Sequence, residues 1–324
     1  MSRYILSRVA QSLVLLFVVA LITFVLIHAA PGGPGIMMND QKLSAAEIQQ
    51  MKANLGLDRP LYIQFVDWLV QIARGNLGIA YTSDLPVTRM IAVRLPATLL
   101  LGASALVLSL AVAIPVGIVT AIRPRSLVDN VVSAMSFVGV STPVFWLGLM
   151  LIIVFAVDLR LMPAAGMRTQ GAASTIPDLL RHLVMPAFVL ATAFMAGFSR
   201  YVRTAMIEVL AQPYIRTAHS KGLSGRLVLY RHALRNSLIP LVTMVGLALP
   251  LLIGGAAITE QVFAWPGMGQ LAVQAAYSHD YPLIMGITIV VAAAVIGINL
   301  LTDLSYALID PRIDLDAGTG EARA

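Results

Sequence analysis

Cysteine is absent from this 324-residue chain, and lysine occurs only at positions 42, 52 and 221. The lack of cysteine excludes disulfides, a catalytic thiol, and thiolate ligands for zinc or iron–sulfur clusters. None of the three lysines follows a glycine-rich loop of the kind that cradles phosphates in P-loop ATPases. The sequence therefore has no recognisable ATP site of its own.

Charged residues are also scarce, at 12% of the chain, whereas soluble domains carry about 25%. Hydrophobic residues make up 58%, and the mean hydropathy is +0.84. These values place the chain among membrane proteins, surrounded by the lipid bilayer, and the apolar runs described next predict an all-α integral membrane fold. The net charge of +6 does not point to nucleic acid, because excess lysine and arginine in a membrane protein mark its cytoplasmic loops.

Six apolar runs are long enough to cross the hydrocarbon region, which takes about 20 residues. They lie at about Val9–Ala30, Ala97–Ile122, Val131–Val157, Leu183–Gly197, Leu238–Thr259 and Leu283–Leu308. The positive-inside rule places both termini in the cytoplasm, because the basic residues cluster before the first run, between the second and third, and between the fourth and fifth. The predicted parts are an N-terminal span (1–30), an external loop (31–96), a five-helix core (97–308) and a cytoplasmic tail (309–324).

The external loop is expected to be folded. Ser44–Glu47 forms a capping box, and Gly56 offers a left-handed helix stop. A second helix is predicted to start at Pro60, with an apolar side formed by Tyr62, Phe65, Trp68, Leu69 and Ile72. This helix would lie along the membrane–water interface on the external side, or it would pack against the rest of the protein's own external segment.

The cytoplasmic loop at about 200–240 contains seven lysine and arginine residues and one acid, Glu208. Pro213 and Gly222 bracket a short predicted helix, and Ser224 can cap a further helix through Asn236. One explanation is that the positive charges only fix the orientation of the chain in the membrane. The helix–glycine–helix pattern is better explained by docking of a partner, so this loop is the expected place for an external motor.

Other energy sources and chemistries lack their usual residues. A proton- or ion-coupled transporter buries acids or histidines at mid-membrane, but His28, Glu260 and Asp303 lie near the ends of their spans. The five histidines form no HExxH pair, and the span serines have no histidine at matching depth. We therefore expect no catalytic residue, no metal site and no cofactor, with a self-sufficient secondary transporter as the less favoured alternative.

The basic loop resembles the EAA region of ABC importer permeases, in the form found in dipeptide, oligopeptide and nickel transporters. Arg216-Thr217-Ala218 stands in the place of Glu-Ala-Ala, three residues separate it from Gly222, and Pro240 closes the segment further on than in sugar permeases. Further segments similar to family signatures are Leu55–Tyr62, Gly75–Gly78, Ser141–Phe145, Leu161–Pro163, His182–Pro186, Glu260–Gly269, Asp280–Pro282 and Asp303–Arg312.

This resemblance implies a type I importer permease with six transmembrane helices in a bacterial inner membrane. The chain would pair with a second permease as a heterodimer, bind two ABC ATPase subunits, and receive substrate from an extracytoplasmic binding protein. Its large loop after the first span resembles that of the first permease of such pairs. The expected cargo is dipeptides or oligopeptides, with nickel and glutathione as alternatives within the family.

The resemblance also assigns roles to residues. The ATPase-coupling residues would be Tyr214, Arg216, Thr217, Ala218, Lys221, Gly222 and Leu223. Candidates in the loop after the fifth span are Glu260, Phe263, Trp265, Pro266 and Gly267. Phe263 and Trp265 could contact the binding protein or line the mouth of the pathway. Alternatively, they could anchor the chain at the outer interface, where aromatic side chains collect.

Overall fold

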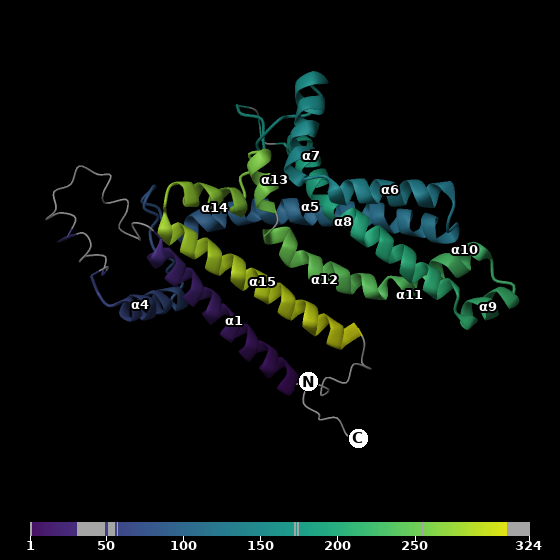
Figure 1. The fold of residues 1–324 in the computed structure, drawn as a ribbon, viewed down its shortest axis with the longest axis horizontal. Coiled ribbons are helices and arrows are strands. Elements are labelled where there is room, and N and C mark those ends of the chain that lie inside the picture. The colour runs from purple at the N-terminus through teal and green to yellow at the C-terminus, as the bar shows by residue number, and fades with distance from the viewer. Residues whose placement is uncertain are drawn as a thin grey trace. The chain divides into compact units, whose positions relative to one another are not determined.

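The computed structural model describes residues 2–30, 49–50, 56, 58–171, 173, 175–254 and 256–309. Within these residues the chain is helical, apart from its connections and one isolated β-bridge between Ile79 and Pro86 (Figure 1). The all-α prediction is therefore confirmed. The predicted capping box at 44–47 and nearly all of the tail at 309–324 lie outside the described residues.

The chain divides into two compact units. The first comprises Met1–Pro96 and Gly267–Ala324, and the second comprises Ala97–Pro266. The division falls within helix α5, and each unit has apolar clusters of its own.

The first unit is built on two long helices, α1 (Ser2–Ala29) and α15 (Tyr281–Ile309), which lie side by side (Figure 1). Arg8 and Asp303 join them through an ion pair of 3.4 Å. The shorter helix α14 (Met268–Tyr277) packs against α15. Most of the α1 side chains are exposed in the isolated chain, which suits a helix surrounded by lipid.

Helix α4 (Leu61–Ala73) begins directly after Pro60, as the sequence predicts. Two aromatic side chains of its predicted apolar side, Phe65 and Trp68, pack against Phe24 of α1, with 5.2 Å between the ring centroids of Phe24 and Phe65. Tyr62 stays 71% exposed. The helix is therefore held by the C-terminal end of the first span through part of its apolar side.

The second unit contains most of α5 (Val87–Ile122) and the helices that pack around α8 (Ile176–Leu210). The others are α6 (Leu127–Ser141), α7 (Val144–Leu151) with the π-helix η2 (Ile152–Asp158), α9 (Pro213–Ser220), α10 (Gly225–Leu227), the π-helix η3 (Val228–Leu234), α11 (Arg235–Ser237), α12 (Ile239–Gly254) and α13 (Ala256–Val262). Helix α8 forms the centre of the unit, because it has many buried residues and because α6, α7, α12 and α13 pack against it.

Among the described residues, four single helices are long and apolar enough to cross a membrane, and the number reaches six if each of two bent pairs forms one span. The third predicted span, at about Val131–Val157, corresponds to one of these bent pairs. Helices α6 and α7 meet at 101°. The bend occurs because Thr142, which precedes Pro143, adopts extended backbone (φ −80°, ψ 123°), as steric contact with the proline ring favours.

Other segments also differ from the sequence prediction. Helix α5 begins ten residues before the predicted second span, and the predicted loop between the fifth and sixth spans contains α14. The helix expected after Ser224 forms and is capped by that serine, but its middle is the π-helix η3. Helix α8 continues beyond the predicted fourth span, Leu183–Gly197, as far as Leu210.

Candidate coupling site

Helix α9 stands apart from α8 because two residues interrupt the helical path. Helix α8 ends at Leu210, and Gln212 adopts extended backbone (φ −67°, ψ 146°) as the N-cap of α9. Pro213 then occupies the first helical turn, where its missing N–H leaves no hydrogen bond unmade. The short helix predicted from sequence is thereby confirmed as a separate element.

The C-terminal end of α9 is a Schellman motif centred on Gly222. The Gly222 N–H donates to the His219 carbonyl at 2.9 Å, and the Leu223 N–H donates to the Ala218 carbonyl at 3.3 Å. Gly222 has φ +77°, in the left-handed region where a Cβ atom is unfavourable. The glycine thus turns the chain sharply away from the helix, as its position in the sequence predicts.

The two sides of α9 have different surroundings. Ile215 and Ala218, three residues apart, are 3% and 8% exposed and join a cluster that includes Met206 and Val228. Leu223 packs against the same cluster as the apolar contact that accompanies a Schellman motif. The buried side holds the helix on its own unit and leaves the opposite side accessible.

The accessible side carries most of the predicted coupling residues. Tyr214, Arg216, Thr217 and Lys221 are exposed. The Tyr214 hydroxyl accepts a hydrogen bond of 2.9 Å from the Asn236 amide, which ties the start of α9 to α11. The structure therefore divides the predicted set into exposed side chains, two buried contacts (Ala218 and Leu223), and the turn residue Gly222.

This part of the molecule is strongly basic. Exposed Arg200, Arg226, Arg231 and Arg235 lie on the elements that flank α9, and Glu208 is the one acid between residues 200 and 240. Cations at this density repel one another, and an acidic or polar partner surface would relieve that repulsion.

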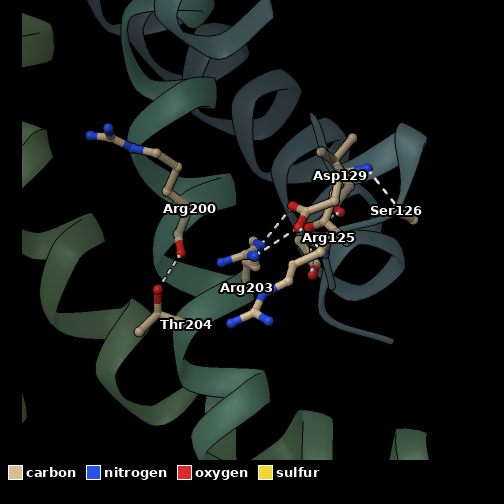
Figure 2. A network of polar contacts seen from close by, with 9 residues as sticks. Arg125, Ser126, Asp129, Arg200, Arg203 and Thr204 are labelled. Atoms are coloured by element: carbon tan, nitrogen blue, oxygen red, sulfur yellow. Dashed lines mark hydrogen bonds and ion pairs between the residues drawn. The ribbon is translucent and has the colours of Figure 1, made fainter. Parts of the chain in front are cut away.

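A set of polar contacts that the sequence analysis did not single out joins α6 to α8 (Figure 2). The Arg203 Nε and Nη2 atoms each donate to the Asp129 carboxylate at 2.8 Å. The same carboxylate accepts from the Arg125 N–H at 2.8 Å, and the Ser126 hydroxyl accepts from the Asp129 N–H at 3.2 Å. We refer to Arg125, Ser126, Asp129 and Arg203 as the polar clamp.

The candidates after the fifth span have interior positions. Glu260, Phe263 and Trp265 are at most 2% exposed. The Thr98 hydroxyl donates to Glu260 Oε1 at 2.6 Å, and Trp265 Nε1 donates to the Ala97 carbonyl at 2.9 Å. Phe263 and Trp265 therefore form part of the packed interior of the second unit, and their roles at the pathway mouth or at the outer interface stay predictions.

Pro266 and Gly267 lie at the division between the two units, and Gly267 is the N-cap of α14. The preceding Ala264 has φ +46°, an unfavourable conformation for a residue with a side chain. The Trp265 N–H donates to the Glu260 carbonyl at 2.8 Å across this turn. The strained turn directs Trp265 into the interior.

In the first unit, Asp280 provides another buried link. Its carboxylate accepts from the N–H and the hydroxyl of Thr82, at 2.9 and 2.8 Å, and from the Leu283 N–H at 3.3 Å. Burial, with a smaller contribution from the Asp280 charge, raises the pKa of the neighbouring Tyr81 phenol. The acid therefore holds the segment around the Ile79–Pro86 bridge to the start of α15.

Two protein-family models match this chain, and one of them covers α9 and the helices around it. Residues 113–315 match the family described as binding-protein-dependent transport system inner membrane component, and residues 1–102 match the N-terminal component of such systems. The chain belongs to this family. The matched core region includes α9, Gly222 and both partners of the ion pair in the polar clamp.

Full-length relatives agree with this assignment. The permease is 43% identical over 315 residues to the oligopeptide transport system permease protein AppB of Bacillus subtilis, covering 97% of this chain and 100% of the relative. It is 36% identical to the dipeptide transport system permease protein DppB of Escherichia coli, covering 97% and 99%. The chain therefore spans essentially the whole length of these relatives.

A solved structure shares the fold. A chain of the MetNI methionine ABC transporter, in an inward-facing conformation, superimposes with a TM-score of 0.56 and 18% sequence identity. The superposition covers 68% of the permease and 96% of that chain. At this identity the likeness supports the importer-type membrane fold and no more.

Proposed function

We propose that this permease is the first of two membrane subunits in an ATP-driven, binding-protein-dependent importer of dipeptides or oligopeptides. The observation that carries this proposal is α9, a separate helix anchored by one side and ended by a left-handed Gly222. Such an element can receive motion from another protein without unfolding. The subunit itself would be non-catalytic, and ATP hydrolysis would take place on the two ATPase partners.

The proposed mechanism follows from how α9 is held. Ile215 and Ala218 attach it to the cluster that also contains Val202 and Met206 of α8. A partner that moves α9 would thus move α8, and with it the helices packed on α8. Nucleotide binding would shift the equilibrium between inward- and outward-facing states through its different affinity for the two.

The topology proposed for the membrane places α9, both termini and the polar clamp in the cytoplasm. Support comes from the distribution of lysine and arginine, since the segment from Gln261 to Asp280 has none and the 200–240 loop has seven. This placement puts α9 within reach of cytoplasmic ATPases, and the 31–96 loop on the side where a binding protein would deliver cargo.

Peptide is the proposed cargo because the relatives' names specify it. AppB and DppB are named as oligopeptide and dipeptide permeases, and a further relative, 38% identical, is named as a probable D,D-dipeptide permease of Escherichia coli. Nickel and glutathione remain the alternatives within the family, and a transport assay separates them from peptide.

The test is reconstitution of the permease with its second membrane subunit, two ATPase subunits and the binding protein in liposomes. ATP-dependent uptake of a labelled dipeptide or oligopeptide is the expected result. Uptake of nickel or glutathione in place of peptide would change the cargo assignment. Uptake by the permease alone, driven by a proton gradient, would refute the ATPase-dependent function altogether.

Two α9 variants test the coupling role more directly. Arg216→Ala removes an exposed charge, so we expect weaker ATPase binding with an unchanged melting temperature of the purified subunit. Ile215→Ala removes a buried anchor and should destabilise the subunit by about 2–4 kcal/mol. If Arg216→Ala binds the ATPase as tightly as wild type, this residue does not contribute to the proposed interface.

A further inference from the structure

The polar clamp joins α6 to α8 through an ion pair with two hydrogen bonds. Both nitrogen atoms that Arg203 presents to Asp129 are at 2.8 Å, a paired geometry that fixes orientation as well as distance. Asp129 is 3% exposed, whereas the Arg203 side chain is 31% exposed and reaches the surface of the unit. One turn earlier on α8, the Arg200 guanidinium lies 5.8 Å from the centroid of the Phe137 ring of α6.

The clamp also orders the connection between α5 and α6. Arg125 has φ +61°, which is unfavourable for a residue with a side chain, and its N–H donates to Asp129. Ser126 caps α6 through the Asp129 N–H. A single carboxylate therefore holds the preceding turn, the start of α6 and the side of α8 together.

The position of the clamp connects it with α9. Arg203 lies about 10 Å of helix before the end of α8 at Leu210, and α9 follows after two residues. On its other side, Asp129 lies in the first turn of α6, whose far end meets α7 at the 101° bend. The clamp is thus located between the candidate coupling helix and the bent α6–α7 pair.

We propose that Asp129 and Arg203 are positioning residues that make α6 move together with α8 when α9 is displaced. This inference rests on the proposed function, since it requires that α9 receives the motion. Without the ion pair, the short turn at 123–126 would allow α6 to lag behind α8. Motion of α9 would then reach the α6–α7 pair less completely, through the remaining packing of these helices on α8.

If the ion pair only stabilised the fold, its removal would not change the uptake per ATP hydrolysed. A double variant in which both side chains are neutral tests this alternative. Asp129→Asn combined with Arg203→Gln leaves no uncompensated buried charge, and the asparagine oxygen can still accept from the Arg125 N–H. In the full reconstituted importer, we expect normal assembly and basal ATP hydrolysis. The uptake per ATP hydrolysed should fall about tenfold.

A reduction of less than about twofold in this ratio would overturn the proposal. The matched control is Arg123→Gln, which removes an exposed arginine from the same turn and should leave the ratio unchanged. Arg203→Lys keeps the charge but lacks the planar pair of donors, so we expect a ratio between those of wild type and the double variant.

A distance measurement tests the inference in the native pair. Because the chain has no cysteine, single cysteines at exposed Val140 of α6 and Glu208 of α8 accept spin labels specifically. The distance between the labels should stay the same in nucleotide-free and vanadate-trapped importer. A nucleotide-dependent change in this distance would overturn the proposal, whatever the double variant does.

The outcomes also separate this inference from the proposed function. If α9 is the coupling helix but the clamp does not transmit motion, α9 variants lose coupling while the neutral double variant keeps it. If α9 is not the coupling helix, Arg216→Ala and Gly222→Ala both retain coupled uptake, and the proposed function fails first.

Discussion

Replacement of Gly222 by alanine tests the relation between one backbone angle and energy coupling. A Cβ atom built at this glycine meets no heavy atom within 4 Å, so the substitution creates no clash. The entire cost comes from φ +77°, which for a residue with a side chain is about 1–2 kcal/mol. That range corresponds to a roughly 5- to 30-fold loss in the population of the native turn relative to alternatives.

The turn orients α9 against the partner, so we expect the loss to appear in coupling and not in membrane insertion. The assay compares ATP-dependent uptake and binding-protein-stimulated ATP hydrolysis in proteoliposomes that contain equal amounts of assembled importer. Gly222→Ala should lower both by roughly 5- to 30-fold. Gly222→Asn should lower them less, because asparagine tolerates the left-handed conformation.

Gly225 offers a matched control three residues further on. It has no heavy atom within 4 Å of a built Cβ and no positive φ, so Gly225→Ala should leave uptake unchanged. Wild-type uptake by Gly222→Ala, or an equal loss in both variants, would refute the reasoning from the backbone angle.

Two further substitutions test packing within each unit by thermal unfolding of the purified subunit. Trp265→Phe removes the hydrogen bond to the Ala97 carbonyl and should destabilise by about 1–3 kcal/mol, whereas a surface contact residue would leave stability unchanged. Gly286→Ala would place a Cβ 2.5 Å from Val87 Cγ1 and should cost about 1–3 kcal/mol. Gly297→Ala on the same helix α15 meets nothing within 4 Å and serves as the control.

The helical elements near α9 were predictable because their signals are local. Pro213 is favourable in a first turn and unfavourable further inside a helix, and Gly222 can adopt φ +77° without strain. Ser224 caps the next helix through its own side chain. None of these effects depends on a residue far away in the chain, so a single sequence carries the information.

The positions of the aromatic side chains after the fifth span were not predictable in this way. A tryptophan in a segment free of lysine and arginine resembles an interfacial anchor, but Trp265 packs inside because the turn at Ala264 redirects it. Its partner, the Ala97 carbonyl, is 168 residues away in sequence. Likewise, Pro143 disfavours a helical conformation at Thr142, but the 101° angle between α6 and α7 was not predictable from the proline alone.

Composition and apolar run length determined that this chain is a helical membrane protein, since no water-soluble fold could bury so much apolar surface with so few charges. Pro213, which favours a helix start, and Gly222, which favours a helix end, determined that the basic loop contains a short helix. Tertiary structure alone brought Asp129 to Arg203, 74 residues apart, and buried Glu260 beside Thr98. Those pairings depend on which helix faces pack together, and packing is a property of the whole fold that no local stretch of sequence specifies.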